Sequence, residues 1–393
     1  MRRGFPDAYS HCSDVASCSL CASIGECHEA ALRRCCRLSR CLRRPCPEHG
    51  QAHVRGVRAG VNSTESIHPS PTPTPQPVQV RDIPATVTPA IPSTPVAAPP
   101  PPPKPKPVLD DAGEPSKSLR AQILLERAWF SPGELDGAWG SKSRRALAGF
   151  QQSRGLEATG ELDEATWAEL DKDAVPALVD YTIEEADVAG PFLPTPSGMM
   201  AKSKMKNITY QSAAEGLGEK FHSSPALLAA MNPDVPLNVA GGMLRVPNVR
   251  DAAPLAPAAK IEVDKSDAAL RLLDAEGKAY AQFPITSGTA KFPLPIGDWT
   301  IKSINADPWY NYDPKLIVTA RRGDRKALLP PGPNGPVGSM WMALSKPHYG
   351  IHGTPEPGLI GRTQSSGCVR LTNWSAHAVA SAASVGMTVS MVE

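Results

Sequence analysis

The sequence predicts a multidomain protein that ends in a β-rich domain with one late helix. Apolar residues recur at helical spacing within 116–172, so we expect a small three-helix domain there. Residues 178–249 combine strand-like and helical patterns and predict a small α/β module. In 258–393 the hydrophobic period switches to two, which is typical of strands in a sandwich or barrel.

Two segments without hydrophobic periodicity precede these domains. Residues 1–68 hold eight of the nine cysteines, without clean zinc-ligand spacing and without the apolar stretch of a signal peptide. We expect a disordered Cys/Arg-rich leader there, which a wrongly assigned start site would explain. Residues 69–115 are expected to be a proline-rich linker, since 16 of the 39 residues from 69 to 107 are proline. At ~3.1 Å per residue, that run would reach roughly 120 Å as a stiff tether. A ligand for an SH3-type domain is the alternative.

Composition narrows the class of function. The formal net charge of the 393 residues is only +2, which gives no argument for a nucleic-acid partner. No apolar run is long enough for a transmembrane span. His348 and His352 have the spacing of a zinc-binding pair, but Pro347 and Gly350 argue against the helix that such a pair needs. We therefore expect no metal and no cofactor.

The domain at 116–172 is predicted from three helical patterns. The expected helices lie at 118–130, at 141–155 with Ser141 as N-cap and Gly155 as stop, and at 159–170 with Asp163 as cap. The stretch "LDGAWGSKSRRALAGFQQSRGLEATGELDEATWAEL" resembles the peptidoglycan-binding domain family. That resemblance implies binding to cell-wall polymer. A helical bundle that only packs on its neighbours is the alternative.

The module at 178–249 is predicted as strand, helix, helix, strand. Ser224-Pro225 is a typical helix start, and "GGMLRVPNV" at 241–249 reads as the closing strand. The order resembles a LysM module, a glycan binder, although residues 190–206 interrupt the pattern. An inter-domain spacer is the alternative.

The β-rich domain at 258–393 is predicted from alternating segments. A hairpin is expected over 261–288 with its turn at 275–277, and further strands at 297–304, 340–345, 349–354 and 387–392. The late helix is expected over 373–386, capped by Thr372 or Asn373 and stopped by Gly386.

Cys368 is the one cysteine after Cys46, and its neighbours are those of a nucleophile. The N-terminus of the late helix and Arg370 would both favour a thiolate. His352, on a separate strand, could serve as base, and the N–H groups of Gly367 and Cys368 are candidate oxyanion donors. A buried apolar cysteine and a surface histidine are the alternatives.

The C-terminal domain holds four segments that follow one another along the chain, at 288–301, 333–345, 349–354 and 365–373. Through these segments, the domain resembles the L,D-transpeptidase catalytic domain of YkuD type. The resemblance implies a β-rich fold with Cys368 as nucleophile and His352 as base. It places Ser366, Gly367, Cys368 and Arg370 on the family's motif, and Gly353 and Thr354 at the strand end, in contact with substrate. Ser366 stands where family members often have histidine, which leaves His352 as the base.

The implied function is formation of 3–3 cross-links in peptidoglycan, through a cysteine thioester that releases D-alanine from tetrapeptide stems. The expected partners are stem peptides and glycan strands, in the periplasm or cell envelope, with a role in cell-wall biogenesis and cell shape. An L,D-carboxypeptidase, a transferase that anchors an envelope lipoprotein, and a non-catalytic wall-binding protein are the alternatives.

Overall fold

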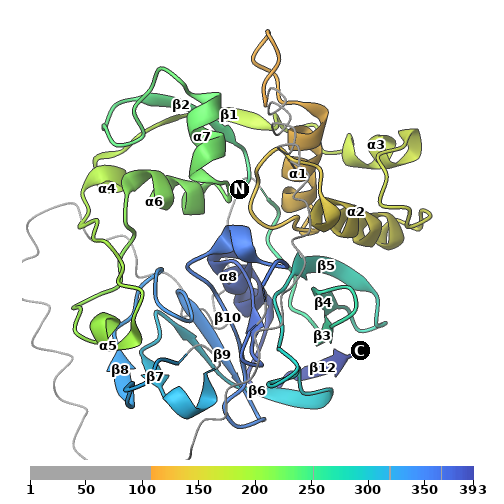
Figure 1. Cartoon of the computed structure of the whole chain (residues 1–393). Coiled ribbons are helices and arrows are strands. Elements are labelled where there is room, and N and C mark those ends of the chain that lie inside the picture. Colours follow the sequence, from red (N-terminus) through yellow and green to blue (C-terminus); the bar gives the residue numbers. More distant parts are fainter. Residues whose placement is uncertain (1–107, 251, 318–319, 364) are drawn as a thin grey trace, which may run out of the picture. The chain divides into compact units, whose positions relative to one another are not determined.

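The computed structural model describes residues 108–393 except 251, 318–319 and 364 (Figure 1). All of these residues fall within one compact unit, Ala97–Glu393. The predicted leader at 1–68 and the linker up to residue 107 lie outside the described residues. Within the described part of the chain, no helix has the length and apolarity needed to cross a membrane.

Helices lie where the sequence predicts them in the first domain: α1 Lys117–Arg127, α2 Ser141–Ser153 and α3 Glu164–Leu170. The Ser116 and Asp163 side chains cap α1 and α3 by accepting backbone N–H groups. Gly155 follows the end of α2 with φ +74°, as predicted. The prediction of Ser141 as N-cap is wrong by one residue, because Gly140 already has the extended backbone of a cap.

The second module contains the predicted strand–helix–helix–strand order with two additional short helices. Its elements are β1 Leu178–Thr182, α4 Glu185–Val188, α5 Met199–Lys202, α6 Ala213–Lys220, α7 Pro225–Met231 and β2 Met243–Pro247. β1 and β2 pair antiparallel. Ser224 caps α7 and Pro225 is its first residue, as predicted. α5 lies inside the stretch that interrupts the sequence pattern.

Eight strands of the third domain form one mixed sheet. They are β3 Lys260–Asp264, β4 Ala269–Leu273, β5 Ala279–Pro284, β6 Gly297–Ala306, β9 Met340–Leu344, β10 Gly350–His352, β11 Val369–Arg370 and β12 Thr388–Val392. Their order is β11-β10-β9-β6-β12-β3-β4-β5, in which the pairs β10–β11 and β12–β3 are parallel. A separate antiparallel pair joins β7 Tyr310–Tyr312 to β8 Ala327–Leu329. Short 3₁₀ turns lie at Pro314–Leu316 and Pro357–Leu359.

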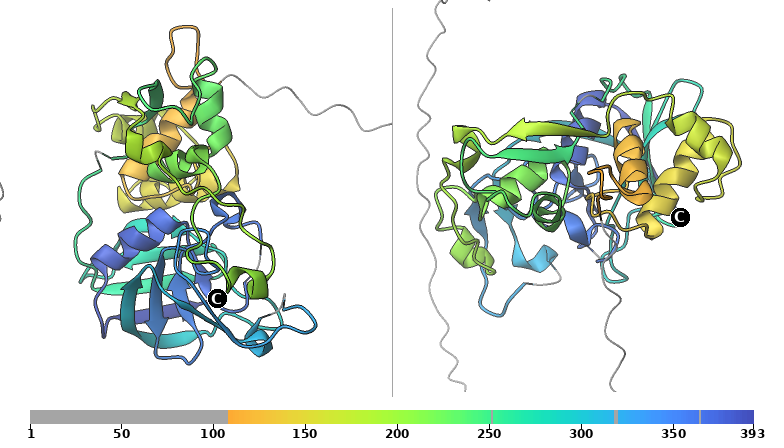
Figure 2. Two further views of the ribbon diagram at one scale, coloured as in Figure 1. Left: turned by 90° about the vertical axis from the view of Figure 1, so that its left-hand side faces the viewer. Right: turned by 90° about the horizontal axis from the view of Figure 1, so that it is seen from above.

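The sheet curls until its two ends meet. Just after β5, Thr286 exchanges two backbone hydrogen bonds with Arg370 of β11, at 3.0 and 2.9 Å. Helix α8, Asn373–Ala382, packs on β9 and β10 (Figures 1 and 2). Thr372 caps α8, but Gly386 does not end it. The Gly386 N–H instead bonds the Ile301 carbonyl of β6 and leads into β12.

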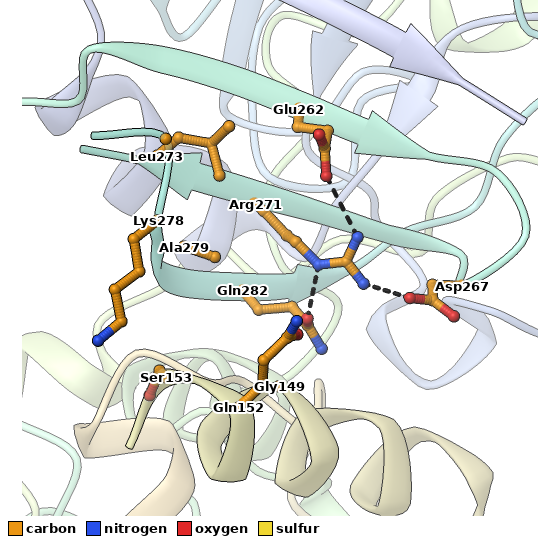
Figure 3. A pocket seen from close by; sticks show the side chains of 11 residues that line it. Gly149, Gln152, Ser153, Glu262, Asp267, Arg271, Leu273, Lys278, Ala279 and Gln282 are labelled. Carbon is orange, nitrogen blue, oxygen red and sulfur yellow. Dashed lines mark hydrogen bonds and ion pairs between the residues drawn. The ribbon is translucent and has the colours of Figure 1, made fainter. Parts of the chain in front are cut away.

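Gln282 of β5 ties the first domain to the sheet. Its backbone exchanges hydrogen bonds with Trp129 and Ser131, and its side chain donates to the Arg145 carbonyl of α2. Beside it, a pocket of about 340 Å³ lies between α2 and β3–β5, where Arg271 is already paired with carboxylates and with Gln282 (Figure 3). None of the predicted site residues lines this pocket.

Candidate active site

The register of β10 and β11 sets the geometry of the site. His352 is the partner of Arg370, and Ile351 is the partner of Val369, in a parallel pair. Ile351 and Val369 are fully buried in the core. Side chains alternate along a strand, so His352 and Arg370 lie on the other face. Cys368 lies directly before β11, and the charge of Arg370 acts on both His352 and Cys368. The predicted nucleophile, base and guanidinium therefore belong to one region at the paired strands β10 and β11.

A buried serine fixes the backbone of the cysteine. The Ser365 hydroxyl donates to the Cys368 carbonyl at 2.6 Å and accepts the Gly367 N–H at 3.1 Å. Gly367 has φ +103°, and a Cβ there would meet the Tyr349 ring at 2.7 Å, so the position requires glycine. The predicted tight backbone at Gly367 is confirmed. Sequence reasoning did not single out Ser365, whose signal was a second serine directly before the Ser-Gly-Cys run.

This serine changes the expected oxyanion donors. The Gly367 N–H is occupied by Ser365, so it is not open to a substrate oxygen. Of the two predicted oxyanion donors, only the Cys368 N–H therefore remains a candidate. Ser366 is partly buried beside them.

The imidazole of His352 is held as a neutral base. Its Nδ1–H donates to the Gly353 carbonyl at 2.6 Å, and the backbone of Val337 also forms a hydrogen bond with the ring. The ring stacks on Trp341, with centroids 5.4 Å apart. Burial, and then the positive charge of Arg370, lower the pKa of His352 to about 3. The ring is therefore uncharged at neutral pH.

The thiol of Cys368 is also held in its neutral form. Its Sγ lies 3.7 Å from the His348 carbonyl, and the residue is partly buried. Burial raises the pKa of Cys368, while a hydrogen bond with the backbone of Gly350 and the charge of Arg370 oppose that rise. The expectation of a resting thiolate is wrong, because desolvation outweighs both. The thiol of Cys368 and the imidazole of His352 are therefore both neutral at neutral pH.

Tyr310 of β7 is a site residue that sequence reasoning missed. Burial and then the charge of Cys368 raise the pKa of Tyr310 to about 12, which places its phenol near the sulfur. Arg370 acts on the same phenol, and the Arg370 Nε is buried without a hydrogen-bond partner. The signal available in the sequence was the aromatic run "WYNY" at 309–312. A neutral phenol can donate a hydrogen bond to a substrate oxygen.

The strand end after His352 is built by Gly353 and Thr354. The Gly353 N–H donates to the Met340 carbonyl at 3.1 Å. Thr354 is 5% exposed, and its hydroxyl accepts the Glu356 N–H. Both residues shape the loop that leaves β10.

An open pocket lies at the β7–β8 pair. It has a volume of about 490 Å³ and is lined by that pair, the turn after β7 and His348. Its lining does not include Cys368, His352, Arg370 or Tyr310. Cys368, His352, Arg370 and Tyr310 together can perform acyl transfer through a covalent thioester.

Comparison with known families agrees with this chemistry. Residues 258–391 match the model of the L,D-transpeptidase catalytic domain (YkuD). The C-terminal domain is thus similar to L,D-transpeptidase catalytic domains. Residues 117–170 match a model described as "Putative peptidoglycan binding domain". The two matched segments lie within the regions where the sequence shows the same two resemblances.

Two relatives and one solved structure show the extent of the likeness. The "Putative L,D-transpeptidase YkuD" of Bacillus licheniformis is 41% identical over 78 residues, which are 20% of this chain and 47% of that protein. Its namesake from Bacillus subtilis is 28% identical over 171 residues, 42% of this chain and 87% of that one. The L,D-transpeptidase from Xylanimonas cellulosilytica is 14% identical, covers 71% of this chain and 94% of that one, and has a TM-score of 0.33, too low to support an argument. Since the chain spans about half the length of the first relative, the activity of the whole protein is a proposal.

Proposed function

We propose that this protein is a peptidoglycan L,D-transpeptidase that forms 3–3 cross-links through a thioester on Cys368. The observation that supports it most is the pairing of β10 with β11, which makes His352 the partner of Arg370, two residues after Cys368. The matched catalytic domain spans all three residues.

The first half-reaction forms the thioester. As Cys368 Sγ attacks the carbonyl of the third stem residue, His352 Nε2 takes the thiol proton, and the Cys368 N–H donates to the oxygen of the tetrahedral intermediate. The carbon–nitrogen bond to D-alanine then breaks, and the imidazolium returns its proton to the leaving amine. Because the pKa of His352 is lowered to about 3, the imidazolium is a strong acid and gives up that proton readily.

The second half-reaction uses the side-chain amine of a neighbouring stem. Its nitrogen bonds to the thioester carbonyl, the carbon–sulfur bond breaks, and the amine proton passes through His352 to the sulfur. The thiol is thereby restored. Arg370 and Tyr310 face the same space and would hold donor oxygens while the acyl group is transferred.

The other domains suit a wall enzyme. The region at 117–170 would bind peptidoglycan, and the LysM-like module at 178–249 would bind glycan, so both would raise the local substrate concentration. A wall substrate implies an extracytoplasmic location, in the periplasm or cell envelope, and a role in wall biogenesis and cell shape. The proline-rich segment would act as the tether.

The test is incubation of the full-length protein with purified disaccharide-tetrapeptides, followed by mass spectrometry of the products. We expect a cross-linked dimer that lacks one D-alanine. Cys368→Ala should abolish turnover, and His352→Ala should lower kcat by about 10³-fold or more, since nucleophile and base act as a unit.

Other products would assign other activities. Tripeptide monomers alone would mean an L,D-carboxypeptidase, and transfer that occurs only to a lysine of an added envelope lipoprotein would mean a protein-anchoring transferase. Turnover that Cys368→Ala leaves unchanged would contradict the proposal. Binding to peptidoglycan without turnover by the wild type would indicate a non-catalytic wall-binding protein.

A further inference from the structure

Gly353, whose carbonyl orients His352, packs against one asparagine. Asn373, the first residue of α8, accepts the Ser339 N–H at 3.1 Å and donates to the Pro333 carbonyl at 3.3 Å. A Cβ on Gly353 would meet the Asn373 Oδ1 at 2.1 Å, so the two residues are in close contact. Asn373 thus holds the loop at 331–339 next to Gly353, whose carbonyl accepts the hydrogen bond of the His352 Nδ1–H.

A second feature bears on the same loop from outside the catalytic domain. Ile208, in the chain between α5 and α6, donates its N–H to the Pro331 carbonyl at 2.9 Å and accepts the Asn334 N–H at 3.2 Å. A Cβ on Gly332 would meet the Ile208 carbonyl at 2.2 Å, so the contact requires glycine there. Ile208 is fully buried.

Side chains reinforce this backbone pairing. Asn334, 3% exposed, donates from Nδ2 to the Glu215 Oε1 of α6 at 3.0 Å, and the Lys202 ammonium of α5 donates to the Asn334 carbonyl at 3.4 Å. The His222 ring after α6 stacks on Trp374 of α8, with centroids 5.0 Å apart and 9° between the planes. The second module therefore contacts both supports of Gly353, the loop and the start of α8.

We propose that the segment from Ile208 to Glu215 is a positioning element for the catalytic base: it fixes the loop at 331–339, and through Asn373 and Gly353 it sets the orientation of the His352 ring. The inference rests on the proposed function and gives the second module a role beyond glycan binding. Residues 190–206, which interrupt the LysM-like pattern, contribute Lys202 of α5 to the same loop.

The test compares three variants of the full-length protein. Glu215→Ala removes the acceptor of the Asn334 side chain, whereas Glu215→Gln keeps an oxygen acceptor at the same place. Glu185→Ala, at an exposed position of α4, is the matched control. We expect Glu215→Ala to lower kcat about tenfold with KM within about twofold, because a small displacement of a catalytic group costs rate rather than binding. Glu215→Gln should restore at least half of the wild-type kcat.

A second measurement does not depend on peptidoglycan turnover. The rate at which iodoacetamide alkylates Cys368 is followed against pH by mass spectrometry of the peptide that contains it, which separates it from the eight N-terminal cysteines. Loosening the loop admits water to His352, so its pKa should rise and the acid limb of the profile should move to higher pH in Glu215→Ala. Among the described residues, the charged group that acts on this ring is Arg370, which is unchanged in the variant.

The outcomes separate the two proposals. A shifted alkylation profile without any turnover by the wild type would reject the transpeptidase function and keep the positioning role. Wild-type turnover with an unshifted profile and unchanged kcat in Glu215→Ala would overturn the positioning role alone. A lower melting temperature with unchanged kcat per folded molecule would also overturn it, because the contact would then be structural only.

Discussion

At the scale of single residues, the Arg370 guanidinium acts to lower the pKa of both His352 and Cys368, and both effects favour the proposed reaction. Arg370 lowers the pKa of His352, which keeps the base free of a proton. It also opposes the rise that burial imposes on the pKa of Cys368. The single charge of Arg370 therefore keeps the base unprotonated and eases deprotonation of the nucleophile.

Removing that charge should therefore shift the whole pH profile. In Arg370→Gln, both pKa values rise, so we expect kcat/KM to reach its optimum at higher pH, with a lower rate at pH 7. The rate of Cys368 alkylation should move in the same direction. Arg370→Lys keeps the charge and should stay nearer to wild type. An Arg370→Gln profile that overlies the wild-type profile would show that the charge does not tune these groups.

Residue-level prediction from sequence was strongest where the chain itself limits the choice. Gly367 and Cys368 can be recognised from sequence because glycine is needed where the backbone turns tightly and because Cys368 is the one cysteine after Cys46. His352 can be recognised because it lies on a strand with a clear alternating pattern. Ser365 and Tyr310 escaped because their roles come from contacts made by folding: a hydroxyl that bridges two backbone groups, and a phenol brought from another strand. The protonation state of Cys368 was also not predicted from sequence, because burial in the folded protein decides it.

At the scale of elements, the edge strand β5 is completed by the first domain. Gln282 pairs its backbone with Trp129 and Ser131, and its side chain reaches the Arg145 carbonyl and Arg271. Gln282 is 4% exposed, so each of these hydrogen bonds is shielded from water. The contact covers a sheet edge that would otherwise expose unpaired backbone groups.

We expect Gln282→Ala to destabilise the protein by about 1–3 kcal/mol, because it leaves the Arg145 carbonyl and the Arg271 Nε without their partner. Chemical denaturation measures this change. Gln152→Ala, on the exposed side of α2 in the same pocket, is the control and should change stability little. Since the Gln282 side chain bonds to Arg145 and Arg271 and to no residue of the candidate site, kcat of the folded variant should be unchanged. Equal stability of the two variants would contradict the role of Gln282.

Element boundaries follow the length of each pattern. β9 and β12 were predicted within one or two residues. The predicted hairpin over 261–288 is wrong in its strand count, because a turn at 265–268 divides its first strand into β3 and β4 and makes a three-stranded unit with β5. β7, β8 and β11 have only two or three residues, too few to show a period, and exist because a partner strand lies beside them. Helix α8 ends four residues before Gly386 because that residue bonds to β6 instead.

At the scale of the whole molecule, the second module and the catalytic domain share a buried carboxyl. Glu219 of α6 lies against Asn373, and its Oε1 is buried without a hydrogen-bond partner. Desolvation raises the pKa of Glu219 to about 8. Sequence alone could not predict this, because Glu219 reads as an ordinary polar residue on a short helix until another domain covers it.

The consequence is a dependence of folding stability on pH. Between about pH 4.5 and 8 the folded state holds a proton on Glu219 that the unfolded chain has released, so the free energy of unfolding falls as pH rises through this window. Glu219→Gln cannot titrate. Its stability relative to wild type should therefore increase from pH 5 to pH 8.5, and the two proteins should be closest at pH 5. Titration of His352 is common to both proteins and cancels in the difference.

Denaturant melts at four pH values measure this difference in stability, with exposed Glu276→Gln as the control for losing one surface charge. A stability difference that stays constant with pH would mean that Glu219 is charged and solvated, and that the second module does not close over the start of α8.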